Sequence, residues 1–244
     1  MESQVTKSLW ASDAMRKLED EMRCASQTDA SVMLTGESGV GKRYAANMIH
    51  QLSRRRRAPF VAINAATVLD SERSADTEGP PASGKFLQAA EDGTLLIQDI
   101  EHIPAAAQLH LLRFMDRSAT SRRHTRLMTA TTSHLFSLVQ AGEFRDDLFY
   151  RLNVIRFNIP PLRERPEDIP LMFRHYLSVH SGAEAPPLSS AARRRLVEYT
   201  WPGNVSELEA VTKKLCAQPL PELIEPKHLP RPIVECSTPI AKAD

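Results

Sequence analysis

The chain lacks most of the features that mark secreted, membrane-bound or metal-binding proteins. It has only three cysteines, Cys24, Cys216 and Cys236, which are widely spaced and outside any C-x-x-C pair. This pattern argues against a disulfide framework and a zinc site, and it indicates free thiols. The eight histidines form no H-E-x-x-H motif, and none pairs with a cysteine at metal-ligand spacing. We therefore expect no structural metal.

Long apolar runs and an excess of charge are missing as well. No run approaches the roughly 18 to 20 residues of a membrane span, and the start, "MESQVTKSLWASD", lacks the apolar centre of a signal peptide. The net charge of +1 indicates no global polyanionic partner. Hydrophobic residues (42%) and charged residues (25%) stand at ordinary globular values in the 244-residue chain. We predict a soluble, cytoplasmic protein with one large domain, or one domain plus a small one.

Alternating strands and helices are predicted for residues 1–160. Five apolar runs bounded by glycine, proline or polar residues predict strands at 31–35, 59–64, 93–99, 125–131 and 153–159. Helical patterns at 43–53 and 104–117 lie between them. This alternation predicts the α/β class, with a parallel five-stranded sheet covered by helices on both faces.

The pattern changes after Pro161. Residues 161–216 contain three helical stretches with no strand between them, which predicts a small helical subdomain that would form a lid. Residues 217–244 are rich in proline and have no clear period, so we predict an extended or disordered tail. The sequence shows no helix-turn-helix pattern there, so we expect no DNA-binding domain in this chain.

A glycine-rich loop, "GESGVGK", follows the first predicted strand and precedes a predicted helix. This G-x-x-x-x-G-K pattern in that context predicts a phosphate-binding loop, because glycines let backbone N–H groups turn toward an anion and lysine adds a full positive charge. A plain turn between strand and helix would not need the lysine. The Ser or Thr that usually follows the lysine and holds Mg²⁺ is Arg43. The candidate nucleotide-binding residues are Gly36, Glu37, Ser38, Gly39, Val40, Gly41, Lys42 and Arg43.

Five motifs together are similar to one family. "GESGVGK", "PFVAINAA", "GTLLIQDIEHIPAAAQLHLLR", "FRDDLFYRLNVIRFNIPPLRERPEDIP" and "WPGNVSELE" resemble, in order and spacing, the AAA+ domain of bacterial enhancer-binding proteins, the ATPases that activate sigma-54 RNA polymerase. The resemblance covers roughly residues 10–215. It implies a P-loop AAA+ core with a helical lid, ATP and Mg²⁺ as cofactors, and assembly into a ring with other AAA+ subunits.

Several positions depart from the family pattern. Where the family has a magnesium-binding Asp and a water-polarising Glu, this chain has the neutral Gln98 and the shorter Asp99. Asp99 remains the candidate catalytic and metal-binding carboxylate, although a one-residue slip into the metal position would turn the apolar strand residues the wrong way unless a bulge absorbed it. Thr132 stands where the family has an Asn that senses the γ-phosphate, and Ser206 replaces the lid arginine. The family's G-A-F-T-G-A loop, which engages sigma-54, is absent from "TVLDSERSADTEGPPASGKF".

Arg145 and Arg151 match family positions that reach the phosphates of a neighbouring subunit, so the resemblance implies arginine fingers and an oligomer. On spacing alone, a surface pair with nearby aspartates is the better interpretation. The basic run 53–57 is more typical of a solvated helix end than of a nucleic-acid site. We interpret Trp201 as packing and His50 as structural.

Three functions follow from these residues. The first is an ATP-binding AAA+ protein of the sigma-54 activator type that regulates transcription, with weakened hydrolysis and doubtful direct contact with sigma-54. The second is a slow but active ring ATPase that remodels a transcription partner. The third is an interaction scaffold that has lost its nucleotide.

Overall fold

In the computed structural model, the described residues are 10–66, 89–120, 124–132 and 134–235. The chain divides into two compact units. The first, which we call the core unit, consists of residues 18–36 and 41–159. The second, the helical unit, consists of residues 1–17, 37–40 and 160–244. In the part of the chain that the structure describes, no helix is both long enough and apolar enough to span a membrane.

The core unit is built on a five-stranded sheet in the order β2-β3-β4-β1-β5, with every neighbouring pair parallel. Its strands are β1 Val32–Thr35, β2 Phe60–Asn64, β3 Thr94–Gln98, β4 Arg126–Thr131 and β5 Ile155–Asn158. The predicted α/β fold with its five parallel strands is therefore confirmed. β2 and β3 run in register up to the pair Asn64 and Gln98.

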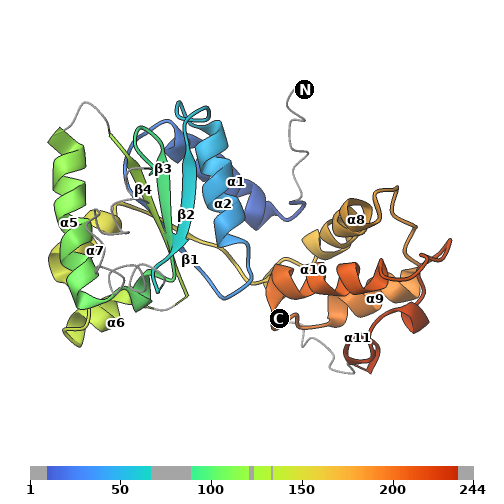
Figure 1. Ribbon diagram of the computed structural model, residues 1–244. Coiled ribbons are helices and arrows are strands. Elements are labelled where there is room, and N and C mark those ends of the chain that lie inside the picture. Colours follow the sequence, from blue (N-terminus) through green and yellow to red (C-terminus); the bar gives the residue numbers. More distant parts are fainter. Residues whose placement is uncertain (1–9, 67–88, 121–123, 133, 236–244) are drawn as a thin grey trace, which may run out of the picture. The chain divides into compact units, whose positions relative to one another are not determined.

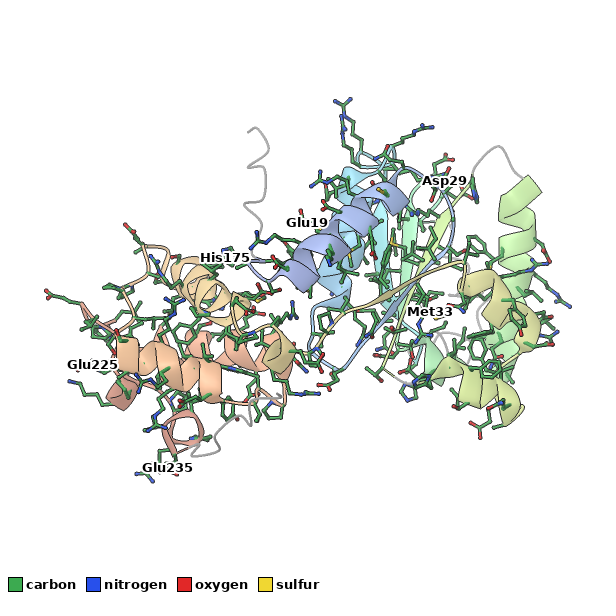
Figure 2. All side chains as sticks on the ribbon, turned by 180° about the vertical axis from the view of Figure 1, so that it is seen from behind. Glu19, Asp29, Met33, His175, Glu225 and Glu235 are labelled. Carbon is green, nitrogen blue, oxygen red and sulfur yellow. The ribbon has the colours of Figure 1, made fainter. Side chains whose placement is uncertain are left out.

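Helices cover both faces of this sheet, as Figure 1 shows. The elements of the core unit are the second part of α1 (Asp13–Ser26), α2 (Lys42–Leu52), a 3-10 turn η1 (Ile100–His102), α5 (Ala105–Thr120), α6 (Leu135–Gln140) and α7 (Asp146–Leu152). Met33, labelled in Figure 2, packs in one apolar cluster with Leu111 of α5 and Leu148 of α7. Val32 and Leu34 are equally buried but point to the other face, where α2 contacts the sheet. Burial on both sides explains why the strands read as continuous apolar runs.

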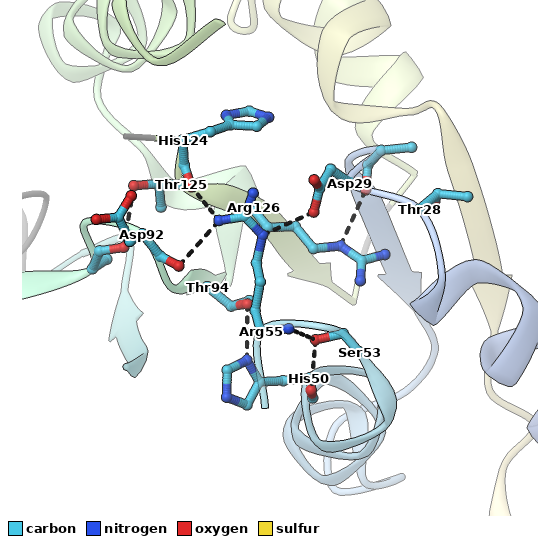
Figure 3. Close-up of polar contacts among 12 residues, drawn as sticks. Thr28, Asp29, His50, Ser53, Arg55, Asp92, Thr94, His124, Thr125 and Arg126 are labelled. Atoms are coloured by element: carbon cyan, nitrogen blue, oxygen red, sulfur yellow. Dashed lines mark hydrogen bonds and ion pairs between the residues drawn. The ribbon is translucent and has the colours of Figure 1, made fainter. Parts of the chain in front are cut away.

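A polar network ties together the ends at which β3 and β4 begin (Figure 3). Arg55 donates to Asp29 at 2.8 Å and to the carbonyl oxygen of Asp92 at 3.1 Å, and it also donates to the carbonyl of His124. His50 is buried and its Nδ1 lies 2.9 Å from the Thr94 hydroxyl. His50 is thus structural, as predicted, and Arg55 of the basic run holds loops together instead of standing free in solvent.

The helical unit contains η2 (Leu162–Glu164), α8 (Asp168–Ser181), α9 (Ser190–Glu198), α10 (Asn204–Leu215), η3 (Pro226–His228) and α11 (Arg231–Glu235). Trp201 is fully buried in its apolar cluster and donates from Nε1 to the Leu196 carbonyl at 2.8 Å, which confirms the packing role predicted for it. The N-terminal segment joins this unit through Asp168, whose carboxylate accepts from the amides of Ala11 and Ser12 at 2.5 and 2.8 Å.

The predicted disordered tail is wrong for residues 217–235. Ile224, Leu229 and Ile233 are buried in the same cluster as Trp201, and Ile224 forms a β-bridge with Leu188. Pro226, one of the prolines that suggested disorder, begins the helical turn η3, since Pro can occupy a first helical position. The apolar residues between the prolines are buried, although their spacing follows neither a helical nor a strand period. Residues 236–244 lie outside the described part of the chain.

Candidate functional site

The glycine loop connects the end of β1 to the start of α2. Gly36, Gly39 and Gly41 have φ of 145°, 76° and 104°, values that L side chains rarely adopt. Gly41 is the N-cap of α2, so the loop leads into the positive end of an 11-residue helix. These features together suit an anion such as a phosphate.

Lys42, the last residue of the motif, is folded back onto the loop. Its ammonium donates to the Gly36 carbonyl at 2.7 Å. Burial lowers the pKa of Lys42, and the carboxylates of Asp99 and Glu101 oppose that shift. Asp99 therefore acts on Lys42 through its charge. The structure adds a second carboxylate at Glu101.

Asp99 follows β3 without any slip of the strand. The register places Gln98 opposite Asn64, and the Ala65 amide donates to the Gln98 carbonyl at 2.8 Å. Asp99 has a left-handed backbone, with φ of 52°, and caps η1. Its Oδ2 accepts from Asn64 Nδ2 at 2.5 Å. The alternative of a one-residue slip is thus not adopted, and Asp99 reaches the site through its backbone turn.

Glu101 is the residue that sequence reasoning missed. Its Oε1 accepts from the Thr132 amide at 2.9 Å and from the Thr132 hydroxyl at 2.7 Å. Burial would raise the pKa of Glu101, but the hydrogen bonds from Thr132 outweigh it and lower the pKa. One signal was present in the sequence, because "QDIE" places a second carboxylate two residues after Asp99. The fold is needed to bring it to the end of β4.

Within the helical unit, loop residues 37–40 are held by side chains from the start of α10 and from η2. Asn204 Nδ2 donates to the Ser38 carbonyl at 2.9 Å and to Glu37 Oε2 at 3.1 Å. Arg163 pairs with Glu37 at 2.6 and 2.9 Å. Hydrogen bonds from Arg163 and Asn204 lower the pKa of Glu37 to about 2.

Ser206 stands at the position where the resemblance implies a lid arginine. Its amide donates to the Gly39 carbonyl at 3.3 Å, beside a 2.9 Å bond from Val205 to the same oxygen. The turn thus contacts the glycine loop through its backbone. A serine here brings no positive charge to the loop.

Two known protein families match this chain. The Sigma-54 interaction domain matches residues 9–158. The chain belongs to this family of AAA+ domains. The AAA+ ATPase lid domain matches residues 163–242, which include the helices of the second unit.

Named relatives are transcriptional regulators. The DNA-binding transcriptional regulator NtrC of Bradyrhizobium sp. is 39% identical over 226 residues, which cover 84% of this chain and 47% of that protein. The sigma54-dependent transcriptional activator SfnR of Pseudomonas putida is 38% identical over 204 residues, covering 75% of this chain and 56% of the relative. This chain thus spans about half the length of the curated relatives it matches.

Solved structures of NtrX from Brucella abortus have the same fold. The complex with ADP has a TM-score of 0.77 at 28% identity and covers 92% of this chain and 55% of the NtrX chain. The complex with ATP has the same TM-score and identity and covers 94% of this chain and 58% of the NtrX chain.

The two candidate arginine fingers of this sigma-54 interaction domain both have carboxylate partners in their own chain. Arg145 pairs with Asp147 through two hydrogen bonds, 3.0 and 2.7 Å long. Arg151 pairs with Asp116. Both arginines are about half exposed, at 46% and 45%.

Magnesium is implied by the family, and neither of two positions that usually serve it carries a negative charge or a hydroxyl, since Arg43 is a cation and Gln98 a neutral amide. Two carboxylates, Asp99 and Glu101, do stand near Lys42. Oε2 of Glu101 is buried and accepts no hydrogen bond from any described residue. A buried carboxylate oxygen of this kind fits a cation. The residues present therefore fit Mg²⁺, but with carboxylates at positions other than those that the family uses.

Proposed function

We propose that this domain binds ATP or ADP at the glycine loop and acts in sigma-54-dependent transcription. The observation that carries the proposal is the loop itself: three glycines with positive φ lead into the start of α2, and the Lys42 ammonium is folded back onto the Gly36 carbonyl. Family membership and the NtrX complexes with ADP and ATP support it.

We propose further that hydrolysis is weakened. Binding needs the loop amides and the lysine, which are in place. Cleavage needs a polarised water and charge neutralisation on the transferred phosphate. The chain offers Asp99 in place of a longer Glu, and Ser206 in place of an arginine. Mg²⁺ bound with the nucleotide would supply charge neutralisation at the outer phosphates.

We propose that this domain regulates transcription by sigma-54 RNA polymerase. The prediction that the G-A-F-T-G-A loop is absent falls on residues 67–86, which lie outside the described residues, and it stays a prediction. Arg145 and Arg151 are exposed enough to exchange their aspartate partners for the phosphates of a neighbouring AAA+ subunit. We propose a homo- or hetero-oligomer in which they serve that purpose.

The test separates binding from turnover. Equilibrium titration with a fluorescent ADP analogue should give saturable binding, and Lys42→Ala should weaken it roughly 10- to 100-fold, since a hydrogen bond to a charged group contributes about 1.5–3 kcal/mol. Lys17→Ala, which removes an exposed lysine from α1, serves as the control. Brisk ATP turnover abolished by Lys42→Ala would favour the active ring ATPase. Failure of the wild-type chain to bind at millimolar nucleotide would favour the scaffold.

The oligomer needs its own measurement. Mixing the chain with a catalytically complete relative should change the ATPase rate of that relative, and Arg145→Ala should remove the change. An unchanged rate at saturating concentration would contradict the proposed role of the arginines.

A further inference from the structure

Two carboxylates, Asp99 and Glu101, lie just beyond the carboxyl end of β3, although the family motif at Gln98 and Asp99 retains only one of them. Gln98 is neutral, but Glu101 enters from η1, one turn beyond the strand. Its Oε1 is held by both the amide and the hydroxyl of Thr132, at 2.9 and 2.7 Å. Two hydrogen bonds to one oxygen fix the direction of a side chain that is otherwise long and flexible.

The second oxygen of this carboxylate is the informative one. Oε2 is buried and has no donor at hydrogen-bond geometry among the described residues, although the Thr131 hydroxyl also acts on this carboxylate. Leaving a charged oxygen buried without a partner is costly, so such an atom usually faces a cation or an ordered donor. Lys42 is the nearby cation, and its own ammonium is already engaged with the Gly36 carbonyl at 2.7 Å.

Asp99 is less suited to this role. Its Oδ2 is engaged with Asn64 Nδ2 at 2.5 Å. In the described part of the chain, no group of three or more His, Cys, Asp or Glu side chains could hold a metal ion by itself. Magnesium in nucleotide sites typically takes one or two carboxylates together with phosphate oxygens and waters, so a single well-placed carboxylate is sufficient.

We propose that Glu101 is the carboxylate that couples nucleotide binding to a divalent cation in this chain, in place of the neutral Gln98. This inference rests on nucleotide binding at the glycine loop. Glu101 attracts the cation, either directly or through a bound water, and without the cation its charge repels the phosphates. The domain therefore takes the nucleotide as its metal complex and discriminates against the free nucleotide.

The experiment measures the coupling between metal and nucleotide. Binding of a fluorescent ADP analogue is titrated with Mg²⁺ and with EDTA, and the ratio of the two dissociation constants is the coupling factor. Glu101→Gln keeps an oxygen that accepts both hydrogen bonds from Thr132 but removes the charge. It should reduce the coupling factor by about 10- to 100-fold, the usual effect of losing a group that supports a metal. Binding in EDTA should be unchanged or tighter.

Two further variants complete the design. Glu91→Gln makes the same change of charge at an exposed residue near the opposite end of β3 and should leave the coupling factor at the wild-type value. Glu101→Asp keeps the charge but withdraws it by one methylene, so its coupling factor should fall between those of the wild type and Glu101→Gln. It also tests the proposal should the glutamine variant fail to fold. The electron paramagnetic resonance signal of Mn²⁺ bound with ADP, which needs no turnover, should weaken in the same order.

The outcomes are distinct. A coupling factor unchanged in Glu101→Gln, or in Glu101→Asp if only that variant folds, overturns the proposal and leaves the proposed function intact. Equal weakening of binding with Mg²⁺ and with EDTA also overturns it, because it shows that Glu101 only holds the site in shape. A wild-type chain that binds no nucleotide under either condition refutes the proposed function, and this inference with it.

Discussion

Replacing Gly39 by alanine should show how tightly the glycine loop is fitted to the turn before α10. A Cβ built on Gly39 would lie 2.3 Å from the Gly203 carbonyl oxygen and 3.2 Å from Ser206 Cβ, and φ at this position is +76°. The first contact is with backbone, so it cannot be relieved by a rotamer change. The loop and the turn must separate, and the two hydrogen bonds accepted by the Gly39 carbonyl would be lost or stretched.

The expected cost is worked from these two effects. A left-handed backbone costs a residue with a Cβ about 1–2 kcal/mol. Each lost hydrogen bond adds about 0.5–1.5 kcal/mol. Gly39→Ala should therefore lower the free energy of unfolding of the helical unit by about 2–5 kcal/mol. The matched control is Gly182→Ala, since Gly182 lies in the same unit, has φ of +68° and has no atom within 4 Å of the added Cβ. It should lose only about 1–2 kcal/mol.

Urea unfolding followed by tryptophan fluorescence measures both variants. The two tryptophans of the chain, Trp10 and Trp201, are both buried and both belong to the helical unit. Equal losses in Gly39→Ala and Gly182→Ala would refute the reasoning, because they would show that the close contact with Gly203 carries no energy. A changed m-value would instead indicate a change in the compactness of the folded or unfolded state, or a loss of two-state unfolding.

Three more predictions concern single side chains. Asp168→Ala should lower the stability of the helical unit by about 2–4 kcal/mol in the same urea assay, because it leaves the buried amides and hydroxyl that Asp168 binds without an acceptor; an unchanged midpoint would contradict this. The pKa of Glu37 is lowered in the folded chain from 4.5 to about 2, so its stabilising effect is present above the unfolded value and is lost as the pH falls toward 2. The difference in unfolding midpoint between wild type and Glu37→Gln should shrink over that range, and a constant difference would disprove the pairing with Arg163. Arg126 is fully buried and burial lowers its pKa, so Arg126→Met should change stability measured by circular dichroism by less than about 1.5 kcal/mol, whereas a large loss would show that its bonds to the Ala25 and Ala30 carbonyls outweigh desolvation.

Much of the core unit could be predicted from the sequence because its signals are local. Strands buried on both faces read as apolar runs, and glycines at positive φ mark the phosphate loop. The helix at 13–26 and the short helices α6 and α7 were not predicted. In α7, the motif "FRDDLFYRL" was interpreted only through its arginines. The spacing of Leu148, Phe149 and Leu152, which are buried in the structure, was not used to predict a helix.

The candidate site was predicted in part. Asp99 and Thr132 directly follow the adjacent parallel strands β3 and β4, and Lys42 begins the helix that follows β1, the other neighbour of β4. Glu101 was missed because its role depends on the turn of η1 and on the position of Thr132, 31 residues away. The pairing of Arg145 with Asp147 favours the interpretation made from spacing alone, and the arginine-finger role stays a prediction.

The sequence by itself determined the five strands, the helices that became α2 and α5, the glycine loop and the family, because each of these has a signature in contiguous residues. Only the tertiary structure decided which carboxylate stands beside Lys42, how Asn204 fastens the loop, and that the proline-rich segment packs onto the helical unit. Those outcomes depend on contacts between residues far apart in the chain, and burial and hydrogen bonding at such contacts have no local pattern to reveal them.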